Sequence, residues 1–233
     1  IFTDNKWYYA SPSGALANGW QLIGGQWYWF DSLDGCSMVT GRRVIDGHPY
    51  LLGTYGLING WCLDNGLWYW GSNGEVLTGW LQTGNNWYWL DPANDGAMSR
   101  GIVSVGSSRY YLSDSGAMAV GWAFDGTDWY YADGSGALAS GWRSVNGAWY
   151  WLDIANDNRM VTGFFSIGSN RYHFSSTGAL SLGWFMSDGA WYYAEPSNAS
   201  GIVKTGWLKD GSQYYYLDPA VDGKMLLGHF SVN

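Results

Sequence analysis

A short unit that opens with glycine recurs along the whole chain. The stretch from Gly79 to Gly101 shows it clearly: Gly-Trp and a short segment, a Gly-Asn-Asn turn, the aromatic run Trp-Tyr-Trp-Leu at 87–90, and a second polar turn ending in Gly-Ala-Met. Alternating side chains that are rich in aromatic rings and bounded by Gly, Asn and Asp predict a β-hairpin. One hairpin is only marginally stable in water, so this chain must stack many of them.

The opening glycine returns every 19 to 23 residues, which is room for one hairpin and a connecting turn. Repeats open at 19, 41, 60, 79, 101, 121, 141, 163, 183 and 206, after a partial repeat at 1–18 and before a terminal stub at 228–233. We therefore expect residues 1–233 to form a single repeat array held by contacts between neighbours. Because the chain opens inside a repeat, we also expect a missing N-terminal part.

Three types of repeat alternate. Type A repeats, opening at 19, 79, 141 and 206, have a long second turn rich in aspartate. Type B repeats, opening at 41, 101 and 163, lack tryptophan after the opening glycine and carry Pro49, Arg109 or Arg171 where type A has its second tryptophan. Type C repeats, opening at 60, 121 and 183, have both tryptophans. The order A–B–C predicts an all-β solenoid of stacked hairpins with about three repeats per superhelical turn.

Composition excludes several classes of function. The net charge is −8 and the few basic residues form no run, which argues against a nucleic-acid partner. No apolar stretch is long enough to span a membrane, so we expect no membrane insertion. Three scattered histidines provide no catalytic constellation and no zinc spacing, and we expect neither an enzyme nor a cofactor.

Aspartates and cysteines favour structural interpretations. The aspartate pairs of the type A turns, such as Asp91 with Asp95, are residues that turns require, and this interpretation outweighs calcium binding or catalysis. Cys36 and Cys62 are two cysteines only, too few for a disulfide framework or a metal set. Two unpaired thiols are favoured, and a disulfide between them stays an alternative.

The aromatic residues carry the functional signal. Each type A or C repeat has a first tryptophan after the opening glycine and a second at the start of the second strand. We expect a third ring from the second strand of the following repeat, such as Trp89, Tyr111, Trp151 or Tyr216, to complete a cage. Such a cage attracts a quaternary ammonium group at about 0.5–2 kcal/mol per ring, or stacks on a sugar. The pairs are Trp20/Trp27, Trp61/Trp68, Trp80/Trp87, Trp122/Trp129, Trp142/Trp149, Trp184/Trp191 and Trp207/Tyr214.

A purely structural role for these rings is the alternative, because a thin core can be filled by aromatic side chains. The selective loss of the tryptophans from type B repeats favours ligand contact. Methionines precede the next opening glycine; Met98 and Met160 would form the floor of a cage, with core filling as an equal alternative. The middle residues of the aromatic runs are assigned to packing between hairpins; they are Tyr28, Tyr69, Tyr88, Tyr130, Tyr150 and Tyr192.

The unit Gly-Trp, a short segment, Gly, Trp-Tyr-Tyr/Trp, Asp and a turn ending in Gly-x-Met closely resembles the choline-binding or cell-wall-binding repeat. The resemblance covers essentially the whole chain. It implies a left-handed β-solenoid with choline sites between successive hairpins, lined by the paired aromatic residues named above. It also implies a secreted protein on the cell wall of a Gram-positive bacterium, or one encoded by a phage, that binds choline on teichoic acid.

Departures from the family pattern keep other functions open. Type B repeats lack both tryptophans, so roughly one joint in three should be empty or different; Arg109 and Arg171, at the second tryptophan position there, would also repel choline. Similar repeats bind sugars in the glucan-binding domains of glucansucrases and in clostridial toxins, which makes a carbohydrate-binding array for an α-glucan or host glycan the alternative. A structural stalk or a homodimer formed through a terminal hairpin, such as that after Gly206, is the third hypothesis. Our leading hypothesis is a non-catalytic surface-attachment module.

Overall fold

The computed structural model describes residues 1–197, 200–228 and 231, and their regular structure consists of β-strands and single-turn 3₁₀ helices. Within the repeats, two strands form an antiparallel hairpin. The hairpins are β1 (Phe2–Thr3) with β2 (Lys6–Trp7), β3 (Gly19–Ile23) with β4 (Gln26–Asp31), β6 (Gly41–Ile45) with β7 (His48–Gly53), β9 (Gly60–Asp64) with β10 (Leu67–Ser72), β12 (Gly79–Thr83) with β13 (Asn86–Asp91), β15 (Gly101–Val105) with β16 (Ser108–Leu112), β17 (Gly121–Phe124) with β18 (Trp129–Ala132), β19 (Gly141–Val145) with β20 (Ala148–Asp153), β22 (Gly163–Ile167) with β23 (Asn170–Phe174), β24 (Gly183–Ser187) with β25 (Ala190–Ala194), and β26 (Gly206–Asp210) with β27 (Gln213–Asp218).

Short additional strands follow some hairpins and complete their repeats. They are β5 (Ser37–Met38), β8 (Gly56–Leu57), β11 (Glu75–Val76), β14 (Ala97–Met98), β21 (Arg159–Met160) and β28 (Lys224–Met225). In type A repeats the long second turn is a 3₁₀ helix: η1 (Ser32–Asp34), η2 (Pro92–Asn94), η3 (Ile154–Asn156) or η5 (Pro219–Val221). From β3 onward, the first strand of each hairpin begins at the glycine that opens a repeat.

The register of the hairpins decides which rings meet. In the β12–β13 hairpin, Gly79 pairs with Leu90 and Trp80 pairs with Trp89. Trp87 is paired with Gln82 and therefore lies diagonally from Trp80 on the same face. The two tryptophans of one repeat thus share a face without being directly opposite.

Each repeat contributes only a few residues to the core. The residue after the aromatic run pairs with the opening glycine and is fully buried, as shown by Leu90, Leu152, Phe174 and Leu217, each with 0% of its surface exposed. With so little aliphatic core per repeat, contacts between repeats supply much of the stability. Backbone hydrogen bonds provide part of this coupling: the amide of Met118 donates to the carbonyl of Trp87 over 2.8 Å, and that of Leu180 donates to Trp149 over 2.7 Å.

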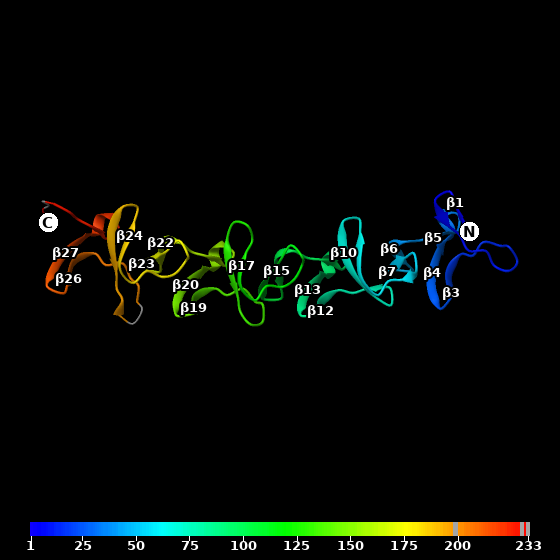
Figure 1. Cartoon of the computed structure of the whole chain (residues 1–233), viewed down its shortest axis with the longest axis horizontal. Coiled ribbons are helices and arrows are strands. Elements are labelled where there is room, and N and C mark those ends of the chain that lie inside the picture. Colours follow the sequence, from blue (N-terminus) through cyan, green and yellow to red (C-terminus); the bar gives the residue numbers. More distant parts are fainter. Residues whose placement is uncertain (198–199, 229–230, 232–233) are drawn as a thin grey trace. The chain divides into compact units, whose positions relative to one another are not determined.

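The chain divides into two compact units, Ile1–Val105 with Tyr110–Met118, and Gly106–Arg109 with Ala119–Asn233. In the first unit the hairpins of types A, B and C follow one another from β3 to β13 (Figure 1). In the second unit the same order runs from β17 to β27 (Figure 1). Each unit therefore contains complete joints between successive repeat types, and the candidate sites lie in these joints.

Candidate functional site

An open aromatic cavity lies where each type C repeat meets the following type A repeat; we call this position a C–A joint. In the first unit the C–A joint is a cavity of about 350 Å³ lined by Trp61, Trp68, Tyr88 and Met98. The ring centroids of Trp61 and Trp68 are 6.4 Å apart with planes at 87°, and Trp61 is 5.0 Å from Tyr88 at 72°. Three nearly perpendicular rings over a methionine present π faces and a soft floor to one small volume.

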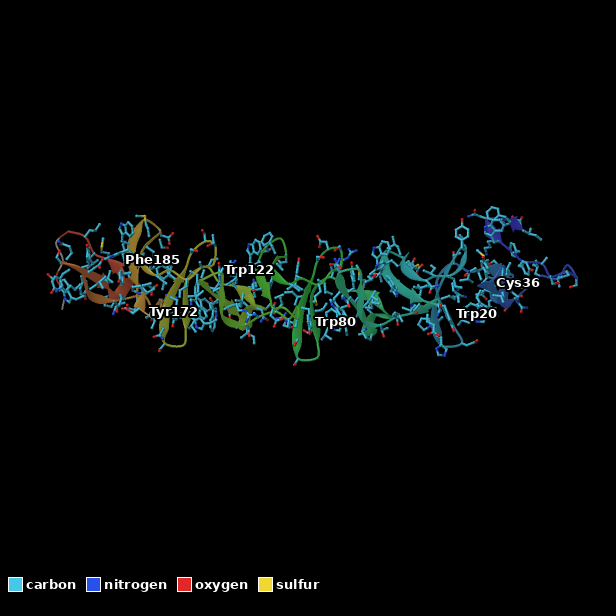
Figure 2. All side chains as sticks on the ribbon, turned by 60° about the horizontal axis from the view of Figure 1, so that its bottom comes forward. Trp20, Cys36, Trp80, Trp122, Tyr172 and Phe185 are labelled. Atoms are coloured by element: carbon cyan, nitrogen blue, oxygen red, sulfur yellow. The ribbon has the colours of Figure 1, made fainter. Side chains whose placement is uncertain are left out.

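The second unit contains two further C–A joints with the same chemistry. One is lined by Trp122, Trp129, Tyr150 and Met160. Its rings repeat the geometry of the first cage, with Trp122 at 6.4 Å from Trp129 and at 4.7 Å from Tyr150. The other is lined by Trp184, Trp191, Tyr215 and Met225. Figure 2 shows the side chains of these hairpins and labels Trp122.

The second tryptophans leave their rings accessible to a ligand. Trp129 exposes 43% of its surface and Trp191 exposes 42%, although indole rings are usually well covered. The first tryptophans are half-buried between the second tryptophan and the third ring. Each C–A cage is therefore open on the side of its second tryptophan.

The third ring comes from a different position than the sequence analysis expected. Tyr88 and Tyr150, assigned there to packing between hairpins, both contact the preceding hairpin and line a cavity. Trp89 and Trp151, expected as third rings, line none of the cavities described above. Trp89 instead lies 5.2 Å from Trp80, its partner across the hairpin, and Trp151 lies 5.4 Å from Trp142.

Strand alternation explains this shift. Neighbouring residues of a strand point to opposite faces, so Tyr88 faces away from Trp87 and Trp89 and toward the preceding repeat. A cage therefore combines the tryptophan face of one hairpin with the tyrosine face of the next. Strand alternation in the sequence predicts that Tyr88 lies on the opposite face, but it does not indicate that this face lines the cavity of the preceding hairpin.

The joints from type A to type B repeats, the A–B joints, assemble the same three kinds of ring. Trp80 lies 6.4 Å from Trp87 and 4.8 Å from Tyr110. The equivalent sets are Trp20, Trp27 and Tyr50, and Trp142, Trp149 and Tyr172. The residue at the floor position varies among these joints, being Leu57, Met118 or Leu180.

In the joints from type B to type C repeats, the B–C joints, the type B hairpin contributes no tryptophan. In the two B–C joints that lie within one unit, the third-ring tyrosines are buried, with exposures of 7% for Tyr69 and 9% for Tyr192. Two of these joints hold an arginine against a ring: Arg42 lies 5.7 Å from the centre of Tyr69, and Arg171 lies 5.4 Å from the centre of Phe164.

Each of three type B arginines also pairs with an aspartate of the type A repeat two positions later. The nitrogen–oxygen distances are 3.3 Å for Arg42–Asp95, 2.9 Å for Arg109–Asp157 and 3.0 Å for Arg171–Asp222. In the type A turns, the first aspartate caps the 3₁₀ helix, as Asp91 does by accepting the amide of Ala93 over 2.9 Å. The last aspartate, in left-handed conformation, binds the arginine, a role that the sequence analysis missed. The sequence contains one signal for this ion pair: arginine recurs in type B repeats and aspartate recurs at the end of the type A turns.

Both ends of the chain contain incomplete sets of rings. Trp207 and Tyr214 of the last type A repeat expose 64% and 65% of their surfaces. Trp207 lies 5.2 Å from Tyr216, its partner across the same hairpin, and no ring contact from a following repeat is found among the described residues. Near the N-terminus, Trp7, Tyr28 and Met38 line a cavity together with Ile1 and Tyr55. The sequence analysis did not include Trp7, although its position matches that of a second tryptophan.

Other classes of site are sparse in the part of the chain that the structure describes. No group of three or more His, Cys, Asp or Glu residues is arranged to hold a metal ion there. No helix in that part is long and apolar enough to cross a membrane. Cys36 and Cys62 are free, half-buried thiols. His229 lies outside the described residues.

Two family models match the chain. The model described as a choline-binding repeat matches residues 17–54. The model described as a putative cell wall binding repeat matches residues 1–16, 78–98, 120–138, 140–153, 162–180, 183–197 and 205–220, which is more than half of the chain. The chain belongs to the choline-binding, cell-wall-binding repeat family. Comparison with curated proteins gave no match.

Solved structures of this family have the same fold. CbpJ from Streptococcus pneumoniae is 26% identical with a TM-score of 0.62, and the match covers 97% of this chain and 99% of CbpJ. Choline binding protein F from Streptococcus pneumoniae, solved in the presence of a peptidoglycan analogue, is 26% identical with a TM-score of 0.62 over 99% of this chain and 93% of its own. The same protein, solved in complex with ipratropium, matches at 26% identity with a TM-score of 0.57 over 97% and 92%.

Proposed function

We propose that this repeat protein is a non-catalytic attachment module that binds the choline groups of a cell-wall polymer in its aromatic cages. The observation that carries the proposal is the C–A cage, which occurs three times with two tryptophans, one tyrosine and one methionine around an open cavity. The first tryptophan, the second tryptophan and the tyrosine present π faces, which attract a quaternary ammonium group. The methionine provides an apolar contact for its methyl groups.

One cage binds choline weakly, and the presence of several cages on one chain compensates for this low affinity. Three cation–π contacts of about 0.5–1 kcal/mol each, with burial of methyl groups, correspond to binding in about the millimolar range. Tethered sites on one chain then raise the overall affinity for a polymer that carries many choline groups. The net charge of −8 adds a favourable long-range attraction for cationic groups.

The joints are proposed to differ in occupancy. The C–A cages are the principal sites, and the A–B joints, which contain the same rings, are additional ones. The B–C joints take no choline, because the type B hairpin supplies no tryptophan to them. In two of them an arginine of the chain also lies against a ring and would repel a second cation. The incomplete pair of Trp207 and Tyr214 is the weakest candidate of the sequence-predicted set.

The architecture and location that accompany this function are also proposals. We infer that the repeats form a left-handed solenoid with about three repeats per turn and serve one attachment module. The A–B–C period and the pairing of type B arginines with type A aspartates two repeats later support this. Membership in the family and its pneumococcal relatives support a place on the wall of a Gram-positive cell.

Titration with competing ligands tests the proposal. Choline and a dextran oligosaccharide are titrated separately into the chain while tryptophan fluorescence is followed. We expect choline to saturate the signal and Trp129→Ala to reduce its amplitude. Trp151→Phe, which alters a ring that lines no C–A cage and keeps an aromatic contact with Trp142, should reduce the amplitude less. Saturation by dextran alone would establish a carbohydrate-binding array instead. Unchanged attachment to choline-bearing cell walls after combined Trp68→Ala, Trp129→Ala and Trp191→Ala substitution would indicate a structural stalk.

A further inference from the structure

One of the three C–A cages has a positively charged side chain in its wall. Arg100 and Ser115 line the cavity of Trp61 and Trp68, beside the floor residue Met98. The residues at the position of Arg100 in the other two cages, two places after the floor methionine, are Thr162 and Leu227. The cavity at Trp129 has hydroxyl groups from Ser176 and Thr177 in its wall, and no cation lines it. The cages therefore share their rings and differ in charge at one position.

The guanidinium of Arg100 is available to a ligand. Among the described residues, the ion pairs involve Lys6, Arg42, Arg43, Arg109, Arg159, Arg171 and Lys204, and none involves Arg100. Arg100 is exposed, and no hydrogen bond to it is found within the described part of the chain. Most arginines of this acidic chain are neutralised by a carboxylate, so an unpaired one in a cavity wall is an exception that calls for a counter-charge.

A positive wall changes which ligand suits the cage. Two like charges a few ångströms apart repel each other, and they do so more strongly near a protein surface than in bulk water. Arg100 would therefore weaken the binding of free choline. A phosphate ester of choline reverses this effect, because its anion follows the ammonium group by only two carbons and can reach the guanidinium. Arginine is well suited to hold a phosphate through charge-assisted hydrogen bonds.

We propose that the Trp61 cage selects a phosphate ester of choline, with Arg100 as the phosphate-binding residue and the three rings as the ammonium site. The proposal rests on the proposed function, since it requires that the cage binds choline. Ser115 adds a hydroxyl group to the same wall; its oxygen lies 2.9 Å from that of Ser113. The Trp129 cage, without a cation, binds choline and its phosphate ester with less discrimination.

The matched cages allow a test that resolves individual sites. The full chain is labelled with 5-fluorotryptophan, and the fluorine resonances of Trp68 and Trp129 are assigned from Trp68→Phe and Trp129→Phe. Each resonance is followed during titration with choline, phosphocholine and glycerophosphocholine at low salt. We expect the preference for the phosphate esters over choline to be about three- to fivefold greater at Trp68 than at Trp129. This is the difference expected from one solvent-exposed ion pair. This difference should disappear at high salt.

Two substitutions test the residue directly. Arg100→Gln should abolish the extra preference at Trp68 and leave Trp129 unchanged, whereas Arg100→Lys should retain part of it. Thr162→Arg should create the same preference at Trp129. Glycerophosphocholine is a phosphate diester and phosphocholine is a monoester. If the diester binds as well as the monoester, the cage recognises a phosphate within a polymer; if only the monoester binds, it recognises a free headgroup.

The two proposals fail in distinguishable ways. If choline shifts both resonances but the preference is equal at the two cages, or is unchanged in Arg100→Gln, the role of Arg100 is overturned and the attachment function stands. If none of the three ligands shifts either resonance, the attachment function itself is overturned.

Discussion

Arg171 and Asp222 are 51 residues apart and form an ion pair of 3.0 Å. The arginine belongs to a type B repeat and replaces a second tryptophan, and the aspartate closes the long turn of a type A repeat. The same pairing occurs between Arg109 and Asp157. These ion pairs connect repeats that are not neighbours in sequence.

Breaking this pair should weaken the second unit. Arg171→Ala removes the ion pair and the contact with Phe164, and we expect it to lower the free energy of unfolding by about 1 kcal/mol. Asp222→Asn removes only the charge and should cost less. A double-mutant cycle in urea should give a coupling of about 0.5 kcal/mol that falls in 1 M salt. Zero coupling at low salt would show that the pair is only a surface contact, and Lys224→Ala serves as an exposed control.

Much of the fold could be predicted from the sequence because its determinants are local. A glycine every twenty or so residues and alternating aromatic side chains predict hairpins, and each first strand from β3 onward begins at a predicted opening glycine. The type B departures likewise predicted that some joints differ. These features depend on residues within one repeat, where side-chain alternation is reliable.

Features that depend on two repeats were harder to predict. Tyr88 completes a cage formed by the preceding hairpin, and Asp95 pairs with Arg42 from a repeat two positions earlier. Nothing within a single repeat indicates which neighbour its tyrosine or its turn aspartate will meet. Both contacts depend on how successive hairpins pack against each other, which the sequence of one repeat does not determine.

Met160 depends on a glycine in the next repeat for its place at the floor of a cage. Gly178 has φ +80°, and a Cβ there would lie 2.2 Å from the sulfur of Met160. Gly178→Ala should therefore displace Met160 and lower choline affinity at the Trp129 cage, besides the roughly 1–2 kcal/mol of left-handed strain. Gly168→Ala provides the control, since Gly168 has φ +60° with nothing within 4 Å. Equal choline binding by both variants in site-resolved titrations would show that the methionine is dispensable.

Stability should decrease when the protein is acidified, through His173. This side chain is buried, stacks on Phe185 at 4.3 Å, and its Nδ1 lies 2.8 Å from the hydroxyl of Ser181. Burial lowers the pKa of His173 below 6.5, while Asp188 opposes the shift. The unfolded chain therefore binds the proton more readily than the folded chain. The contribution of neutral His173 to the free energy of unfolding is complete above pH 6.5 and is lost as the pH falls through the pKa of the folded state. The urea midpoint of unfolding should decrease as the pH is lowered from 7.5 to 5.5. His173→Phe should remove the part of this pH dependence that is due to His173. A pH dependence that is the same in His173→Phe would contradict the assignment.

Substitutions of two adjacent residues in one strand can test which of them supplies the third ring of a cage. Tyr150 lines the Trp129 cage, whereas Trp151 contacts Trp142 and lies on the other face. Tyr150→Leu removes one cation–π contact of about 0.5–1 kcal/mol, so choline affinity at that cage should fall about two- to fivefold. Trp151→Leu should destabilise its own hairpin but leave the choline affinity of the Trp129 cage unchanged, as measured at the Trp129 resonance, with folding checked by circular dichroism. The opposite outcome, weaker binding in Trp151→Leu and normal binding in Tyr150→Leu, would move the ligand to the tryptophan face and restore the cage first expected from the sequence.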